Sequence, residues 1–306
     1  MQESEAITLA DGRTLAYAIY GSSSSSTTAF YFHGYPSSRI EGRLWHDTAQ
    51  KMDIRLIAVD RPGFGNSSFQ PNRKLLDWPT DVLALANHLG LEKFYVLGTS
   101  GGGPYALACA HELPKDRLLG VSIVSGLYPW ALGTSGMMMR SRIMFWVAPW
   151  MTGLFGMILD SQLGQATRDP DPKVFEDLMW KDLETRPGKD LDTIKLEEIS
   201  GPFIAMTREA MKQGGYASAW EGRLFGWYWD FDLEDIDQSI PLTLWHGTDD
   251  KNTPFRMAKE AKEMLPGAVL HAQDGEQHIS YVVKKSEEIL RNLWNGKPRH
   301  LDRRLL

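Results

Sequence analysis

The chain has 306 residues, of which 42% are hydrophobic and 24% are charged, so it can bury a large core and is predicted to be globular rather than disordered or fibrous. Its 33 basic and 39 acidic residues give a net charge of −6, which leaves no basic surplus for binding nucleic acid. Its one cysteine, Cys109, can form no internal disulfide and no thiolate cluster for a metal. A reducing, cytoplasmic location is expected, because the acidic N-terminus also lacks the pattern of a signal peptide.

Short apolar runs alternate with helical patterns along the chain, which predicts a mostly parallel sheet of about eight strands flanked by helices. The first two runs flank Asp11 and Gly12, a pair typical of hairpin turns, and should lie antiparallel. A helix is expected between the N-cap Asp77 and Gly90, and another over residues 282–294, before a basic tail that frays. Strands are expected at residues 7–9, 15–20, 29–32, 54–59, 94–97, 119–124, 242–245 and 269–272.

Residues 128–238 interrupt this alternation and are predicted to form a helical cap, while residues 1–127 and 239–306 form the core. The insert holds seven of the eleven tryptophans and nine of the thirteen methionines, and its segment 160–198 has eleven acidic against six basic residues. One apolar and one charged side are typical of a lid packed over a core.

A run of 17 residues without a charge, 143–159, lies in this insert. A membrane-spanning helix needs about 20 apolar residues, and this run is interrupted by Pro149, Gly153 and Gly156. We therefore expect a buried or interfacial element and no transmembrane segment.

The sharpest chemical signal is a G-x-S-x-G pattern, Gly98 to Gly102, between a predicted strand and a predicted helix. A serine held in a sharp strand-to-helix turn needs small neighbours two residues away on each side, and this pattern is typical of a nucleophile elbow. The pattern also fits a glycine-rich turn in which Ser100 only caps a helix. A phosphate-binding loop is disfavoured, because neither glycine-rich phosphate pattern is complete.

A serine nucleophile needs a base, and the base needs an acid to orient it. His278 is the best of the eight histidines, because it follows the last predicted strand and so lies at the same sheet edge as Ser100. The acid is expected between them in sequence, where Asp249 and Asp250 follow a strand. We predict Asp250, four residues before Pro254, and keep Asp249 as the alternative.

An oxyanion hole needs two backbone N–H groups. One should come from Gly101, directly after the nucleophile, and the other from the loop after the third strand. Tyr35 in the His33–Pro36 segment is the best candidate, although this segment also fits an ordinary turn.

These motifs, in this order, resemble the α/β-hydrolase family in its serine branch with a helical cap, from about residue 5 to residue 295. The resemblance implies an acyl-enzyme mechanism through Ser100, Asp250 and His278, with no metal or organic cofactor. Serine at the nucleophile position disfavours epoxide hydrolases and haloalkane dehalogenases, which carry aspartate there, and Ile279 disfavours hydroxynitrile lyases, which place lysine after the histidine. The matching segments are His33–Pro36 (HGxP), Asp60–Ser67 (D-x-P-G-x-G-x-S), the elbow, and His246-Gly247 with Asp250 and Pro254.

The cap should determine the substrate. Its aromatic and methionine side chains favour a hydrophobic, fairly bulky substrate, and the triad that the resemblance implies would cleave an ester, lactone or related acyl bond of it. They can equally form the cap's own core or a homodimer interface. The candidate substrate contacts are Tyr35, Trp130, Met138, Trp146, Trp227 and Trp229.

Two other readings stay open. Similar proteins include C–C bond hydrolases and acyltransferases with the same triad, and others in which a cap closing over an intact triad serves as a small-molecule sensor. A family likeness does not choose among them.

Overall fold

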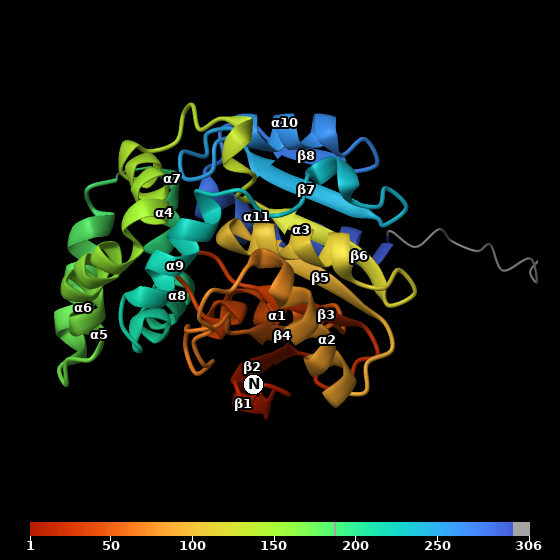
Figure 1. The fold of residues 1–306 in the computed structure, drawn as a ribbon, viewed down its shortest axis with the longest axis horizontal. Helices are drawn as coiled ribbons and strands as arrows, with labels where there is room; N and C mark the ends of the chain where they lie inside the picture. The colour runs from red at the N-terminus through yellow and green to blue at the C-terminus, as the bar shows by residue number, and fades with distance from the viewer. Residues whose placement is uncertain (187, 296–306) are drawn as a thin grey trace, which may run out of the picture.

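A central eight-stranded sheet organises the computed structural model, which describes residues 1–186 and 188–295 (Figure 1). The strand order is β1-β2-β4-β3-β5-β6-β7-β8. β2 pairs antiparallel with both β1 and β4, and β3 to β8 run parallel. The strands are β1 (Gln2–Thr8), β2 (Thr14–Gly21), β3 (Thr28–Phe32), β4 (Arg55–Val59), β5 (Phe94–Thr99), β6 (Leu118–Val124), β7 (Leu242–Gly247) and β8 (Val269–Gln273).

Every strand expected from the sequence is present, and the prediction of an α/β fold with a mostly parallel eight-stranded sheet is confirmed. The opening hairpin turns at Gly12, whose φ is +85°. The tail 297–306 lies outside the described residues.

Five helices cover the two faces of the sheet. α2, α3 and α10 contribute side chains to the apolar cluster on one face, and α1 and α11 contribute to the cluster on the other. Because both faces are covered, the central parallel strands β3 and β5 are buried along their whole length, while the edge strand β8 is partly exposed. The helices are α1 (Arg43–Lys51), α2 (Trp78–His88), α3 (Gly103–Glu112), α10 (Phe255–Met264) and α11 (His278–Asn295).

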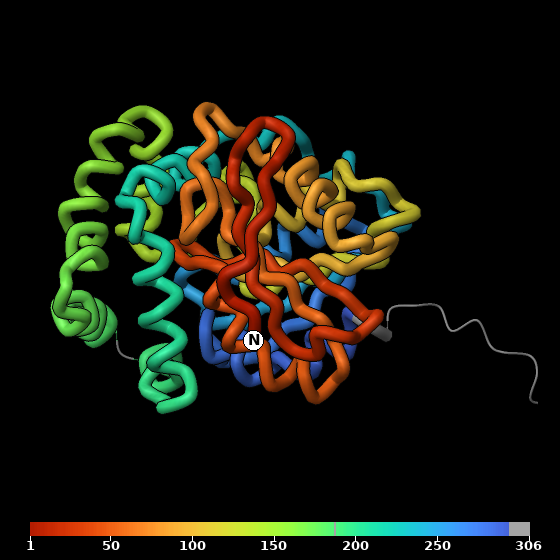
Figure 2. Tube along the Cα trace, turned by 90° about the horizontal axis from the view of Figure 1, so that it is seen from below, coloured from red at the N-terminus to blue at the C-terminus, as the bar shows by residue number. Residues whose placement is uncertain are grey.

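The helices between β6 and β7 form a separate layer at one side of the sheet, where both views place them (Figures 1 and 2). We use the word cap for this layer; its boundaries at 128 and 238 stay a prediction. The cap helices are α4 (Met139–Leu159), α5 (Gln165–Thr167), α6 (Pro172–Leu183), α7 (Lys189–Ile194), α8 (Glu197–Met211) and α9 (Tyr216–Phe225).

The charge-free run of the sequence forms most of α4, which packs along α9. By length and composition alone, the helical stretch Met139–Thr167 could cross a membrane, and 28% of its most apolar window is buried. The backbone leaves helical geometry at Met151, two residues after Pro149. The exposed side of α4 is nevertheless apolar, with Trp146 66% and Trp150 72% exposed.

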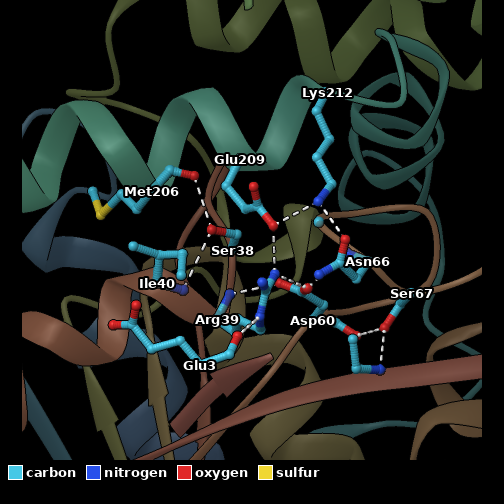
Figure 3. Close-up of polar contacts among 12 residues, drawn as sticks. Glu3, Ser38, Arg39, Ile40, Asp60, Asn66, Ser67, Met206, Glu209 and Lys212 are labelled. Atoms are coloured by element: carbon cyan, nitrogen blue, oxygen red, sulfur yellow. Dashed lines mark hydrogen bonds and ion pairs between the residues drawn. The ribbon is translucent and has the colours of Figure 1, made fainter. Parts of the chain in front are cut away.

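One buried arginine fastens α8 to the core (Figure 3). The Nη1 atom of Arg39 lies 2.7 Å from Asp60 Oδ2 and 2.6 Å from Glu209 Oε1 of α8. Ser38 adds a bond from its hydroxyl to the Met206 carbonyl, at 3.0 Å. Arg39 is 4% exposed and Asp60 is fully buried, so the two charges depend on each other.

Replacing Arg39→Ala should therefore lower the free energy of unfolding by about 3–5 kcal/mol, because Asp60 is left buried and unpaired. Urea denaturation measures this loss. Arg256→Ala is the matched control, because Arg256 is exposed in a 3.5 Å surface pair with Glu260 and should change stability by less than about 0.5 kcal/mol. Equal effects of the two substitutions would contradict the role given to Arg39.

Candidate active site

Ser100 occupies a sharp turn between β5 and α3, at the start of the 3-10 turn η3 (Ser100–Gly102). Its φ is +54°, a left-handed conformation that costs a non-glycine residue about 1–2 kcal/mol. A Cβ atom at Gly98 would lie 2.6 Å from the Gly102 carbonyl oxygen, and one at Gly102 would lie 2.1 Å from the Phe32 carbonyl oxygen. The small residues of the motif are thus required by contacts with the turn and with β3.

His278 and Asp250 lie together at the same edge of the sheet. His278 is the first residue of α11, and its Nδ1 atom lies 2.6 Å from Asp250 Oδ2 in the loop after β7. Asp250 also accepts hydrogen bonds from the backbone N–H groups of Asn252 (2.8 Å) and Thr253 (3.0 Å), and from the Thr253 hydroxyl (3.0 Å). Asp249, the alternative acid, is exposed, so the geometry favours Asp250.

These contacts separate the pKa values of the pair. Burial by itself would raise the pKa of Asp250, but the charges of His278 and His246 and their hydrogen bonds hold it well below the ordinary value. Burial would lower the pKa of His278, but the charge of Asp250 and its hydrogen bond raise it above the ordinary value. An ionised aspartate and a histidine of raised basicity are what proton transfer from a serine requires.

The loop after β6 connects the serine to the histidine. The Leu127 N–H donates to the Ser100 carbonyl at 3.0 Å, and the Ser125 hydroxyl donates to the His278 carbonyl at 3.1 Å. Ser100 is half-buried. Its hydroxyl makes no hydrogen bond within the described residues, to His278 or otherwise; such bonds often form only when substrate is bound.

Tyr35 follows β3 and Ser100 follows β5, and these neighbouring strands flank the point where the strand order reverses, which is where open α/β sheets form a crevice. A Cβ atom at Gly101 would lie 2.7 Å from Tyr35 Cβ, so the two expected oxyanion donors are adjacent. The Gly101 N–H lies in the first helical turn, where backbone donors lack an intrahelical partner.

The Tyr35 side chain is held in the cap. Its hydroxyl donates to the Ser218 carbonyl of α9 at 2.9 Å, and its ring packs against Phe145 of α4 and Phe225 of α9. Trp130 packs edge-on against Phe145. Tyr35, Trp130, Phe145 and Phe225 form an aromatic wall beside the elbow, because a Cβ atom at Gly101 would lie 3.3 Å from the Phe225 ring.

Three of the predicted substrate contacts stay predictions and are not among the residues of the aromatic wall. Trp146 and Trp227 are 66% and 46% exposed, and the Trp227 ring packs against that of Trp150. Trp229 is buried, but it packs against Phe231, whose ring contacts His111 about 12 Å along α3 from its start at the elbow.

Met138 and two residues that the sequence analysis missed lie nearer the site. The Met138 N–H donates to the carbonyl of Lys251, next to Asp250, at 2.9 Å. Phe145 and Phe225 are the missed residues, and both are buried. Their positions on the inner faces of α4 and α9 become recognisable only when the two helices are packed together.

A fully buried charge network underlies the wall, and the sequence analysis missed it too. Arg61 donates from Nη1 to the His33 carbonyl and from Nη2 to the Gly34 carbonyl, the latter at 2.9 Å. Its charge is matched by Glu221 of α9, with Nε to Oε1 at 2.6 Å, and Glu221 also accepts from the Tyr105 hydroxyl at 2.8 Å. The loop before Tyr35 is therefore held by a core arginine and a cap glutamate.

A model of the alpha/beta hydrolase family matches residues 30–290. The chain belongs to the alpha/beta hydrolase family. It is 28% identical to a proline iminopeptidase of Lactobacillus crispatus, covering 89% of this chain and 91% of the relative, and 22% identical to a bifunctional esterase/perhydrolase of Acinetobacter calcoaceticus, covering 89% and 92%. Among solved structures, an esterase from Rhodococcus sp. matches with a TM-score of 0.65 and 21% identity, over 96% of this chain and 99% of that one.

These matches confirm the predicted family and the α/β-hydrolase fold. The prediction of a hydrolase enzyme is confirmed, and the coarser prediction of esterase-type chemistry agrees with the relatives.

Replacing Gly102→Ala should lower the free energy of unfolding of this α/β-hydrolase by about 3 kcal/mol or more, because the added carbon meets the backbone of β3. Thermal and urea denaturation measure the loss. In the control Gly153→Ala, inside α4 and followed by Leu154, the added carbon has no neighbour within 4 Å, so a gain of about 0.5–1 kcal/mol is expected. A Gly102→Ala protein of normal stability would refute the packing argument for the elbow.

Proposed function

We propose that this protein is a serine hydrolase that cleaves an ester, lactone or related acyl bond of a hydrophobic, fairly bulky small molecule. The observation that carries the proposal is the left-handed Ser100, at the same sheet edge as the 2.6 Å pair of His278 and Asp250. A strained, half-buried serine beside an ionised aspartate and a basic histidine is the arrangement that acyl transfer uses.

In the proposed cycle, His278 takes the proton of the Ser100 hydroxyl as the oxygen attacks the substrate carbonyl. The N–H groups of Tyr35 and Gly101 stabilise the oxyanion that develops, each contributing about 3–4 kcal/mol to the lowering of the barrier. His278 then protonates the leaving group, and in the second half-reaction it activates water to release the acyl group. Asp250 keeps the imidazole in the required tautomer.

The aromatic wall supports an uncharged acyl group. A proline iminopeptidase is among the relatives, and the cationic N-terminus of a peptide would need a free carboxylate in the pocket to bind it. In this chain the buried cap carboxylate beside the wall, Glu221, is already paired with Arg61 and lies 3.3 Å from Arg73. These pairs leave the wall without a free negative charge from Glu221, which favours an ester over an aminopeptidase substrate.

Ser100→Ala should abolish hydrolysis of aryl esters of increasing acyl length, by a factor of about 10⁴ or more, because the variant cannot form the acyl-enzyme. A fluorophosphonate probe should label the wild type and not the variant. Labelling without ester turnover would instead favour the C–C hydrolase, acyltransferase or sensor readings. Equal ester turnover by both proteins would contradict the proposal.

The pH profile gives a separate test. Because the pKa of His278 is raised, kcat/KM should rise with pH through a midpoint above the ordinary histidine value of about 6.5. Stopped assays from about pH 5 to 9 with one aryl ester measure the midpoint. A midpoint below the ordinary value, or a flat profile, would contradict His278 as the base.

A cytoplasmic location and a homodimer formed through the cap stay predictions. The exposed apolar side of α4 supports the second, because large apolar patches on soluble proteins often mark interfaces.

A further inference from the structure

The N-terminus of α11 is capped by a residue from another part of the chain. The backbone N–H groups of Ile279 and Ser280 both donate to Asp190 Oδ1, at 2.8 and 3.0 Å. These are first-turn donors, which have no partner within the helix. Gln277, which precedes the helix, is not a preferred N-cap residue, and its own N–H donates to the Ser280 hydroxyl at 3.0 Å. The carboxylate of Asp190, 89 residues away from Ile279 in sequence, thus takes the place of a local N-cap side chain.

Asp190 belongs to α7, and the N-terminal end of this helix contacts the segment that precedes α11 at several points. The Asp190 N–H donates to Gln277 Oε1 at 3.0 Å, so the two segments exchange hydrogen bonds in both directions. Lys189 lies 3.2 Å from Glu276. Gly188 leaves room for the Gln277 side chain, since a Cβ atom there would lie 2.9 Å from it.

An apolar contact accompanies these bonds. Ile279, directly after His278, packs into the cap's own cluster of Leu183, Leu191 and Ile194. The residues on both sides of His278 therefore contact the cap, through Gln277 on one side and Ile279 on the other.

His278 lies between acidic groups from three elements. The negative charges that favour its protonated form are Asp250 after β7, Asp190 in α7 and, more weakly, Glu41 in η1 (Arg39–Gly42). Asp190 itself lies in the fields of His278, Asp250 and Arg186, and its burial raises the pKa of its carboxyl group.

The position of Asp190 at the N-terminus of α11 affects the protonation of His278. The partial positive charge of the first-turn N–H groups opposes a proton on a histidine at that end, and His278 occupies the first position of α11. A carboxylate bonded to those N–H groups offsets that charge.

We propose that Asp190 is a positioning residue for His278. From helix α7 of the cap layer, its carboxylate accepts the first-turn N–H groups of α11 and stabilises the protonated imidazole that forms when His278 takes the proton of Ser100. This inference rests on the proposed role of His278 as the base. It makes the basicity of the core's histidine depend on a cap helix that has no part in the triad.

Two substitutions distinguish the effect of the Asp190 charge from the effect of its hydrogen bonds to the N-terminus of α11. In Asp190→Asn the side chain keeps an oxygen that can accept from Ile279 and Ser280 but loses its charge, so the thermal midpoint should stay near that of the wild type. The acid limb of kcat/KM should move to lower pH, because the pKa of His278 falls when a nearby negative charge is removed.

Asp190→Ala loses the acceptor as well as the charge. Its acid limb should move in the same direction, and its plateau kcat should fall by a further factor of about three to ten as the end of α11 loosens. Asp192→Asn is the matched control, because Asp192 is an exposed carboxylate on the same helix; its profile should match the wild type.

An NMR titration of the His278 imidazole, assigned with a His278→Gln variant, measures the same pKa without a substrate. A lower imidazole pKa in Asp190→Asn than in Asp192→Asn supports the inference even if the protein turns over no ester. A lack of ester turnover would count only against the proposed function. An unchanged imidazole pKa in Asp190→Asn, with an unchanged acid limb, would overturn it.

Discussion

A single buried charge ties the parts of this α/β-hydrolase together. The guanidinium group of Arg61 is fully buried, and a charge in that environment is tolerated only when its donors and its charge are matched. The carbonyl groups of His33 and Gly34 accept two of its donors, and Glu221 of the cap supplies the opposite charge. The loop that leads to Tyr35, the loop after β4 and helix α9 therefore take positions that satisfy one guanidinium group. Replacing Glu221 would leave the guanidinium group buried without the carboxylate that pairs with it, which is strongly destabilising.

The cap is consequently part of the candidate site's framework as well as its cover. Charged or polar contacts fasten three of its helices to the core: α7 through Asp190, α8 through Glu209 and α9 through Glu221. Each of these contacts ends on a segment that carries a candidate site residue or adjoins one. The outer side of α4 has the opposite character, with a row of exposed apolar side chains. The inner side of the cap thus holds the residues of the site in position, while its outer side exposes apolar side chains to solvent.

The sequence could predict the features that depend on local pattern. All eight strands, the elbow and the pairing of His278 with Asp250 follow from periodicity, from the steric limits of a strand-to-helix turn and from the rule that parallel strands end at one edge. The environment of each cap tryptophan could not be predicted, because exposed Trp146 in α4 and buried Trp229 in the loop after α9 both lie among other apolar and aromatic residues in the sequence. The partners of Arg61 and Asp190 were also hidden, since they are separated by 160 and 89 residues.

The paired acidic residues of the cap also bear on the substrate. A carboxylate binds a cationic ligand strongly only if it is not already paired with a basic side chain or with backbone N–H groups of the protein. Here Glu221 is matched by Arg61, Glu209 is matched by Arg39 and Lys212, and Asp190 accepts two backbone donors. The cap's contribution beside Ser100 is the aromatic wall, which offers contact area without charge. The core adds one buried carboxylate there, Glu41, which accepts from the Gly34 N–H at 2.9 Å. A family fold shared with an iminopeptidase is therefore compatible with the different substrate class proposed above, because the cap of this chain pairs these acidic groups with partners in the protein and presents an uncharged aromatic wall.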